Sequence, residues 1–273
     1  MSARQNIAVY DGIGEFMLAI DKPKTWPRIE KSTKGANDFC GGASWSAAMK
    51  MARRGWPEGR AFLSRDIAAA SALTAQVPQR SRGLDVGGHY PDVEAYCAGE
   101  PANMVVVSDE QRQTQPTIRL HASVVASWNI EAEQLRNRAA AILSYADNME
   151  ARNWRVEVEA GFATELASGV NGFRMMVKRA DEPLDLDRAA FVLLHAGFMR
   201  RLAFRWVECN TPASDECIGY GSPVSVAREE NAPPLDIRFP AVTSSAPWHT
   251  PEAATKAVLG QLVAAGIVFD QHV

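Results

Sequence analysis

Alternating apolar and polar positions predict a strand, a helix and a second strand in the middle of the chain. Residues 117–125 (TIRLHASVV) and 154–162 (WRVEVEAGF) have the composition and alternation of strands. Between them, apolar residues recur every three or four positions over residues 130–153, which predicts one long amphipathic helix. Two strands joined by such a helix form a crossover unit, so we expect an α/β core.

The pattern continues with strands predicted at residues 172–179, 202–208 and 236–242. A helix is expected over residues 189–201, with Asp185 or Asp187 as its N-cap, and a final helix over 251–265 precedes a terminal strand at 267–269. Residues 210–234 are polar and rich in Pro, Gly and Ser, which predicts a long loop or lid. The sequence therefore predicts an α/β fold with three layers, in which helices cover a mixed or mostly parallel sheet.

The first 107 residues differ in texture, being irregular, rich in glycine and tryptophan, and α-rich. A short strand is expected at 7–10, and a helix at 45–54 with Ser44 as its N-cap and Gly55 after its end. A second helix is expected from Pro57 to about Leu73. A polar joint over residues 108–116 separates this region from a core domain at 117–273, and the two parts either fold separately or pack as one unit.

Composition narrows the functional classes only slightly. The 273 residues are 47% hydrophobic and 22% charged, with a net charge of −3, which is typical of a globular protein and does not favour nucleic-acid binding. The chain has no apolar run of eighteen residues, which predicts no membrane association, and its first residues lack the features of a secretory signal. Four cysteines without a Cys-x-x-Cys pair are expected to be free thiols. No phosphate-loop or dinucleotide motif is present, so no cofactor is expected.

The most concentrated group of polar residues lies in residues 85–92. Asp85, His89 and Asp92 place two carboxylates and an imidazole within eight positions, and Glu100 follows nearby. Such a set is able to hold a divalent metal or to act as an acid/base group. The alternative is a glycine-rich loop in which the acids cap nearby backbone amides.

Basic and aromatic residues form the other candidate surfaces. Arg200, Arg201 and Arg205 lie near the end of a predicted helix and present forks suited to phosphate or to an acidic partner. Alternatively they are cations favoured at a helix C-terminus. Trp26, Trp45 and Trp56 either anchor a partner interface or fill a small core. His195 lies on an apolar helix and is expected to be a core histidine.

The turn after the first core strand is where α/β folds usually bind ligands, yet residues 121–129 (HASVVASWN) contain no Asp, Glu, Lys or Gly. The order of elements from residue 117 resembles a von Willebrand factor A-type domain. That family carries Asp-x-Ser-x-Ser at this turn, and the matching residues here are His121, Ser123 and Val125. The resemblance therefore implies a metal site that has lost its acidic anchor.

A second resemblance rests on short segments spread over most of the chain. They are residues 39–45 (FCGGASW), 55–59 (GWPEG), 85–89 (DVGGH) with Asp92, 99–104 (GEPANM), 138–142 (RAAAI), Lys178 with 184–185 (LD), and 198–202 (FMRRL). Together they resemble an uncharacterised family of proteins from tailed bacteriophages and prophages. The resemblance implies a phage setting and no catalytic activity.

The leading hypothesis is a non-catalytic phage-encoded interaction or assembly protein, in the host cytoplasm or associated with the virion. Its partner would be a phage or host protein, contacted through the glycine- and tryptophan-containing region and residues 210–234. One alternative is a metal-dependent hydrolase or nuclease centred on residues 85–92. A further alternative is a nucleic-acid-binding accessory protein that uses the arginine cluster.

Overall fold

The computed structural model describes residues 5–63, 83–87, 90–106, 117–151, 154–217, 219–226 and 236–264. The chain divides into two compact units. The larger unit comprises Met1–Ala75 and Thr117–Phe269, and the smaller comprises Gln76–Pro116 and Asp270–Val273.

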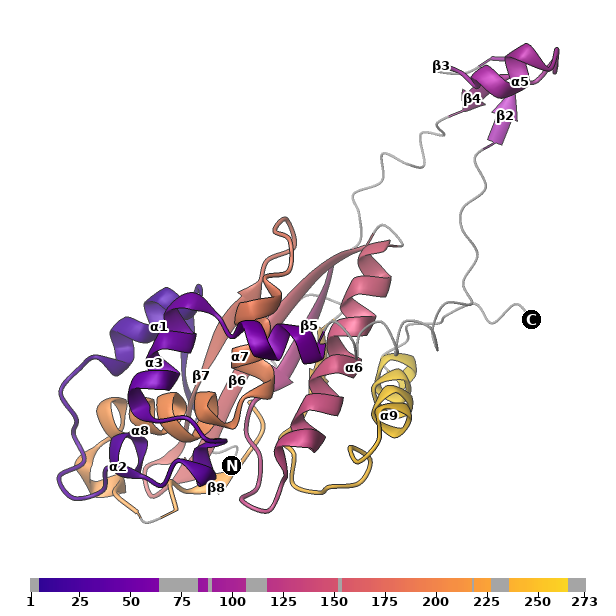
Figure 1. Ribbon diagram of the computed structural model, residues 1–273. Helices are drawn as coiled ribbons and strands as arrows, with labels where there is room; N and C mark the ends of the chain where they lie inside the picture. Colours follow the sequence, from indigo (N-terminus) through magenta and orange to yellow (C-terminus); the bar gives the residue numbers. More distant parts are fainter. Residues whose placement is uncertain are drawn as a thin grey trace. The chain divides into compact units, whose positions relative to one another are not determined.

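A mixed sheet forms the centre of the larger unit (Figure 1). Its described strands are β1 (Gln5–Tyr10), β5 (Thr117–Ser123), β6 (Arg155–Leu166), β7 (Gly169–Lys178), β8 (Ser222–Pro223) and β9 (Asp236–Phe239). The strand order is β1-β7-β6-β5-β9, and β8 pairs with β6. The pairs β1/β7, β5/β6 and β5/β9 are parallel, whereas β6 is antiparallel to β7 and β8. The predicted α/β class and mixed, mostly parallel sheet are confirmed.

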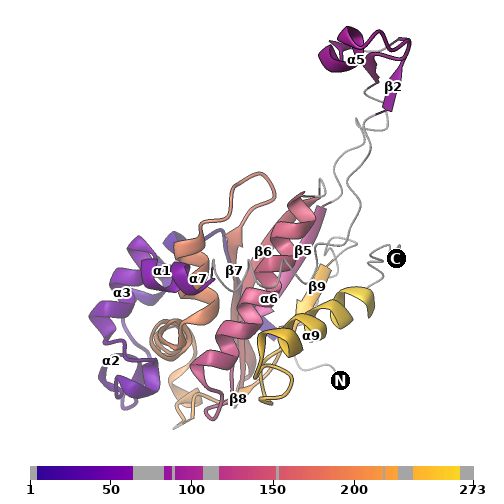
Figure 2. The same cartoon turned by 45° about the vertical axis from the view of Figure 1, so that its right-hand side comes forward.

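Helices supply the rest of the core of this unit. Those described are α1 (Ile13–Ile20), α2 (Lys31–Lys34), α3 (Trp45–Arg54), residues 57–63, α6 (Ala132–Ala151), α7 (Leu186–Leu194), a π-helix (Phe198–Ala203), α8 (Phe204–Asn210) and α9 (Pro251–Ala264). The long helix α6 packs along the sheet, and α9 lies beside α6 (Figures 1 and 2). In the part of the chain that the structure describes, none of these helices combines the length and apolar character needed to span a bilayer.

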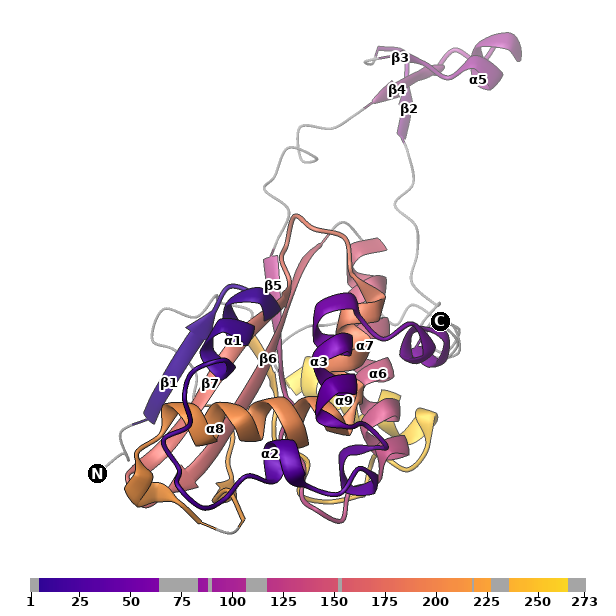
Figure 3. The same cartoon turned by 60° about the vertical axis from the view of Figure 1, so that its left-hand side comes forward.

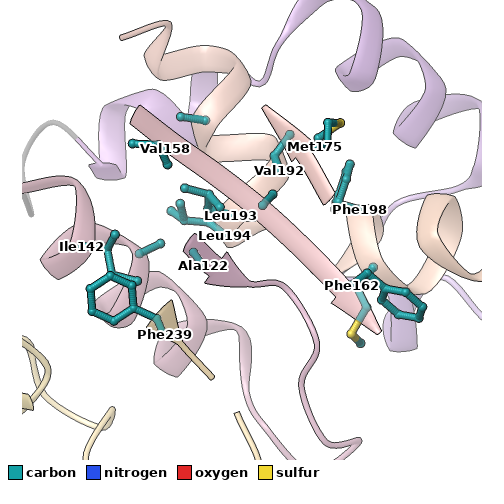
Figure 4. Close-up of a cluster of buried hydrophobic side chains, with 14 of the residues drawn as sticks. Ala122, Ile142, Val158, Phe162, Met175, Val192, Leu193, Leu194, Phe198 and Phe239 are labelled. Carbon is teal, nitrogen blue, oxygen red and sulfur yellow. The ribbon is translucent and has the colours of Figure 1, made fainter. Parts of the chain in front are cut away.

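One face of the sheet is apolar and carries the helices. Ala122 of β5, with Val158 and Phe162 of β6, points into a cluster that also contains residues of α6, α7 and the π-helix (Figure 4). The ring of Phe173 on β7 lies 4.7 Å from that of Phe16 on α1. Burial of these side chains is the main source of stability for the unit.

The opposite face is polar, because the alternate residues of the same strands are charged. Arg119 Nε lies 3.0 Å from Glu157 Oε2, and Arg174 Nε lies 3.5 Å from Glu159 Oε1. Strands enclosed by helices on both faces are apolar throughout, and these are not. The sequence analysis expected helices on both faces of the sheet. The described helices that pack on the sheet instead share one face (Figure 3).

The N-terminal segment belongs to this same unit. The strand predicted at 7–10 is β1, which runs parallel to β7 and pairs Ile7 with Gly172. The contacts divide the chain between Pro116 and Thr117, at the end of the predicted joint, and also after Ala75, so that residues 1–75 join the larger unit. The sequence did not indicate this second division, because a pairing across more than 160 residues leaves no local signal.

Local signals located several elements accurately. Ser44 caps α3 by accepting a hydrogen bond from the Ala47 amide, Gly55 ends α3 at φ 80°, and Asp185 caps α7. The prediction of a strand at 202–208 is wrong, since these residues continue from the π-helix into α8. The strand at 267–269 and the helix extension beyond residue 63 lie outside the described residues. All four cysteines are free.

The smaller unit contains a three-stranded antiparallel sheet with the order β2-β4-β3. Its elements are β2 (Gly83–Asp85), β3 (Tyr90–Pro91), α5 (Val93–Cys97) and β4 (Met104–Val106). All four positions of the predicted metal or polar cluster fall within this unit.

Candidate functional site

A pocket of about 380 Å³ lies at the carboxyl end of β5, where α/β folds usually bind ligands and where the sequence lacks acidic residues. Its walls come from the loop after β5, the π-helix, α8 and the segment before β8. The lining residues are Lys31, Phe39, Val125, Ala126, Ser127, Trp128, Phe162, Thr164, Met199, Arg200, Phe204, Gly219, Tyr220, Gly221 and Pro223. This volume falls within the range of small-molecule sites.

Aromatic rings dominate the described pocket wall. Phe39, Trp128, Phe162, Phe204 and Tyr220 contribute five rings, and Trp128 is 83% exposed. Among the described lining residues the charged side chains are two cations, Lys31 and Arg200. A wall of this chemistry suits a planar, apolar molecule.

Backbone geometry shapes the wall at residues 219–221. Tyr220 and Gly221 have φ values of 58° and 82°, which favour glycine over other residues. A Cβ on Gly221 would lie 2.3 Å from the Glu165 carbonyl oxygen, so only glycine fits there. The Thr164 hydroxyl donates to the Tyr220 carbonyl at 2.5 Å and fixes this turn against β6.

The Tyr220 ring is held in a stack beneath the pocket. Its centroid lies 4.1 Å from that of Phe204 and 5.4 Å from that of Trp26, with nearly parallel planes. The Tyr220 hydroxyl donates to the fully buried carboxylate of Glu208, which also accepts from Ser32 Oγ at 2.6 Å. Burial raises the pKa of Tyr220, and Glu208 adds to the rise, so this phenol stays neutral.

Arg200 connects two sides of the pocket. Its Nη1 donates to the Phe39 carbonyl at 2.7 Å and its Nη2 to the Trp128 carbonyl at 3.3 Å. The guanidinium lies over the Phe39 ring at 4.2 Å. Arg200 is 7% exposed, and burial lowers its pKa.

Arg138 on α6 fixes the strand ends beside the pocket. Its Nη1 donates to the Ser123 carbonyl at 2.8 Å, and its Nη2 donates to the carbonyls of Phe239 and Pro240 at 3.0 and 2.9 Å. Burial lowers the pKa of Arg138 to about 10. This buried cation ties the carboxyl ends of β5 and β9 to α6 and so positions the loop that lines the pocket.

The other two arginines of the predicted phosphate-binding cluster serve the interior of the protein. Arg201 is 1% exposed and donates to carbonyls of the segment that contains α2. Arg205 donates to the carbonyls of Ile20 and Lys22 and pairs with Glu208 at 3.6 Å. Of the three, only Arg200 lines the pocket.

The candidate metal cluster is not assembled in the described residues. The carboxylate of Asp92 accepts from the Ala95 amide at 3.0 Å, as a helix cap does. Glu100 is exposed, and its carbonyl accepts from the Asn103 side chain. His89 and the side chain of Asp85 lie outside the described residues. Within those residues, no group of three or more His, Cys, Asp or Glu is arranged to hold a metal ion.

The three tryptophans named as interface candidates occupy different places. Trp26 is fully buried, and its Nε1 donates to Thr211 Oγ1 at 2.9 Å, so it fills the core. Trp45 and Trp56 are partly buried and pack against the core cluster. The exposed Trp128, which sequence reasoning did not single out, lies instead at the pocket.

The residues that match the Asp-x-Ser-x-Ser motif do not converge on one site. His121 lies on the polar face of the sheet, where its Nδ1 is 3.3 Å from Glu159 Oε1. Ser123 Oγ accepts from the Val125 amide at 3.3 Å, and Val125 lines the pocket. The turn therefore offers packing and backbone contacts at the pocket.

His195 is partly buried at the end of α7. Its Nδ1 accepts a hydrogen bond from the Gly197 amide at 2.9 Å, and the Trp56 ring meets it edge-on at 4.6 Å. Burial lowers the pKa of His195 from 6.5 to about 4. The imidazole is therefore neutral in the folded protein at neutral pH.

This histidine should make stability depend on pH. Above pH 6.5 it is neutral in both states, whereas between pH 6.5 and 4 the unfolded chain binds a proton that the folded chain does not. The free energy of unfolding should therefore fall by about 2 kcal/mol from pH 7 to pH 5 through this residue. Urea unfolding at both pH values measures the fall, and His195→Gln should reduce it. His249→Gln, at an exposed position, should leave it as in the wild type, and an equal fall in His195→Gln would contradict the assignment.

The sequence indicated the end of β5 as the usual ligand position of the fold, but the absence of acidic residues there favoured recognition elsewhere, and few of the pocket residues were singled out. Arg200 was singled out for its charge, whereas Phe39, Phe204 and Tyr220 were not recognised. These residues come from segments far apart in the sequence and share no motif, so only the fold brings them together.

Comparison with known proteins gives a family and no activity. A search of curated proteins finds no match, and a search of solved structures finds none either. A family model described as "Domain of unknown function (DUF7192)" matches residues 2–267, so the chain belongs to that family.

Proposed function

We propose that this protein is a non-catalytic binding protein whose pocket at the carboxyl end of β5 holds a small ligand with a planar, apolar body. The observation that carries the proposal is the pocket itself, with its five aromatic rings and a volume of about 380 Å³. Apolar pockets with a few oriented polar groups are the usual form of a ligand site.

The chemistry of the wall favours binding over catalysis. General acid–base or nucleophilic chemistry needs a titratable group within hydrogen-bond reach of the substrate. The described lining residues include no carboxylate, imidazole or thiol; their basic groups are those of Lys31 and Arg200, and their hydroxyls belong to Ser127, Thr164 and Tyr220. Thr164 and Tyr220 use theirs in donating to protein acceptors, and Tyr220 is held neutral.

The biological setting in this proposal rests on sequence resemblance. A phage-encoded interaction or assembly protein, in the host cytoplasm or on the virion, would use ligand occupancy to bias its contacts with a phage or host protein. The exposed Trp128 supports this reading, because large exposed aromatic residues often mark contact sites.

The two alternative functions have less support in the described residues. A hydrolase centred on residues 85–92 would need Asp92 for metal or substrate, whereas its carboxylate caps α5. Nucleic-acid binding through the arginine cluster would need accessible guanidinium groups, whereas Arg201 and Arg205 bind main-chain carbonyls.

A fluorescent probe tests whether the pocket binds. N-phenyl-1-naphthylamine is neutral and aromatic, and its emission rises when it enters an apolar site. We expect a saturable rise in emission with the wild-type protein at micromolar probe. Gly219→Phe should weaken binding at least about tenfold, because Gly219 lines the pocket and a Cβ there meets no atom within 4 Å.

The matched control is Gly260→Phe, the same change at an exposed position of α9 where the space is equally open. It should bind the probe as the wild type does. Circular dichroism of both variants checks that the fold is kept. Absence of saturable binding in the wild type, or equal binding by Gly219→Phe, would overturn the proposed function.

A further inference from the structure

The pocket is lined by a buried cation, Arg200, that has no counter-charge among the described residues. Arg200 is only 7% exposed, yet no carboxylate among the described residues forms an ion pair with it. A buried, unpaired charge is unfavourable unless an opposite charge or several hydrogen bonds compensate it. This feature separates Arg200 from Arg205, whose partner is Glu208.

The hydrogen bonds of Arg200 are also incomplete. An arginine has five N–H donors. Arg200 uses one on the Phe39 carbonyl and one on the Trp128 carbonyl, and its Nε has no hydrogen-bond partner in the part of the chain that the structure describes. Arg201, the next residue, donates to five acceptors. The two neighbours differ because Arg201 is enclosed by protein, whereas Arg200 lines the pocket.

We infer that the ligand of this pocket carries a small oxyanion, a carboxylate or a phosphate, which binds Arg200 while its planar body contacts the aromatic wall. The inference rests on the proposed function and names the class of its ligand. Planar oxyanions match the fork of a guanidinium, and such charge-assisted hydrogen bonds are about twice as strong as neutral ones. Lys31 on the same wall adds a second positive charge.

The aromatic wall explains why a bare ion would not suffice. The Phe39 ring covers one face of the guanidinium at 4.2 Å, and Phe204 and Tyr220 form a flat stack at 4.1 Å. These surfaces gain stabilisation only when an apolar body displaces water from them. The ligand is therefore an amphipathic aromatic or polycyclic anion.

Matched naphthyl compounds test the charge requirement. The displacement of N-phenyl-1-naphthylamine is measured with 1-naphthylacetate, 1-naphthyl phosphate and the uncharged 1-naphthylacetamide. We expect at least one of the two anions to displace the probe at concentrations about tenfold or more below the amide. The anion that displaces the probe at the lower concentration indicates whether the pocket prefers a carboxylate or a phosphate.

Variants assign the preference to Arg200. Arg200→Met keeps an apolar chain against Phe39 and should bring the ratio of anion to amide affinity close to one, whereas Arg200→Lys should retain part of it. Arg28→Met, at an exposed position outside the described pocket lining, should leave the ratio unchanged. A ratio is compared because it does not depend on the fraction of folded protein.

The possible failures are distinguishable. If the probe binds the wild-type pocket but both anions and the amide displace it equally, the oxyanion inference is overturned and the proposed function stands. If Arg200→Met keeps the full preference, the assignment to Arg200 is overturned. If the probe does not bind at all, the proposed function itself fails.

Discussion

Replacing Arg201 with methionine should lower the free energy of unfolding by about 3–5 kcal/mol. The guanidinium is 1% exposed and donates to Ala43, Ser32 and Gly35 carbonyls at 3.1, 3.1 and 2.8 Å. It also reaches the Lys31 carbonyl and Asn37 Oδ1 at 3.4 and 2.9 Å. Methionine fills similar space but leaves these acceptors without a donor, which is the costly outcome for buried polar groups.

Urea unfolding at neutral pH measures this loss. Arg53→Met, at an exposed position of α3, is the matched control and should change stability by less than about 0.5 kcal/mol. We also expect weaker binding of the probe in the pocket, because Arg201 holds the carbonyl of Lys31, and Lys31 and Phe39 in the same segment line the pocket. A stability of Arg201→Met equal to that of the control would show that this hydrogen-bond network does not hold the segment.

Replacing Glu159 with glutamine should cost about 3 kcal/mol or more. The carboxylate is 4% exposed and lies 3.3 Å from His121 Nδ1, 3.5 Å from Arg174 and 3.7 Å from Arg119. Glutamine keeps the shape and a hydrogen-bond acceptor but removes the negative charge from a site surrounded by nitrogen donors. Glu133→Gln, in an ion pair whose carboxylate is 66% exposed, is the control and should change stability by less than about 1 kcal/mol.

The same carboxylate predicts the acid limit of stability. Burial raises the pKa of Glu159, but the hydrogen bond from His121 and the charges of His121, Arg174 and Arg119 outweigh it and hold the pKa below 4.5. A lowered pKa gives stability that is present above pH 4.5 and is lost as the pH falls through the folded value. Unfolding measured from pH 5 downward should show a shallower loss in Glu159→Gln than in the wild type, and parallel curves would contradict the assignment.

The fold was predictable where the periodicity of the sequence is local. The helix at α6 and the strands β5 and β6 follow directly from their apolar spacing, and Ser44, Gly55 and Asp185 mark helix ends by their capping chemistry. The prediction of a strand at residues 202–208 failed because Leu202, Phe204 and Trp206 alternate with other residues along the chain, as in a strand. Their actual burial follows the helix, with Leu202, Ala203, Trp206 and Val207 inside.

The polar face of the sheet was not predictable from pattern alone. The sequence WRVEVEAGF alternates, but alternation does not reveal whether the charged side faces water or pairs across strands. The register of β5 and β6 places Arg119 opposite Glu157 and His121 opposite Glu159, which converts two alternating sequences into ion pairs. Register across a helical crossover depends on tertiary packing.

The candidate site was half predictable. The fold class indicated the carboxyl end of β5 as the usual ligand position, although its lack of acidic residues argued against a site there, and Arg200 was singled out with Arg201 and Arg205 near the end of a predicted helix. The sequence did not show that Arg200 is buried with no acid beside it among the described residues, or that Phe204 and Tyr220 stack, because both facts depend on segments that only the fold brings together.

The proposed ligand contact is tested by a crystal structure of the protein soaked with whichever of 1-naphthylacetate and 1-naphthyl phosphate displaces the probe at the lower concentration. We expect density for the naphthyl ring against the aromatic wall, with an oxygen of the anionic group within about 3 Å of an Arg200 nitrogen. At a saturating concentration of the ligand, density only at another site, or no density in this pocket, would contradict the proposal.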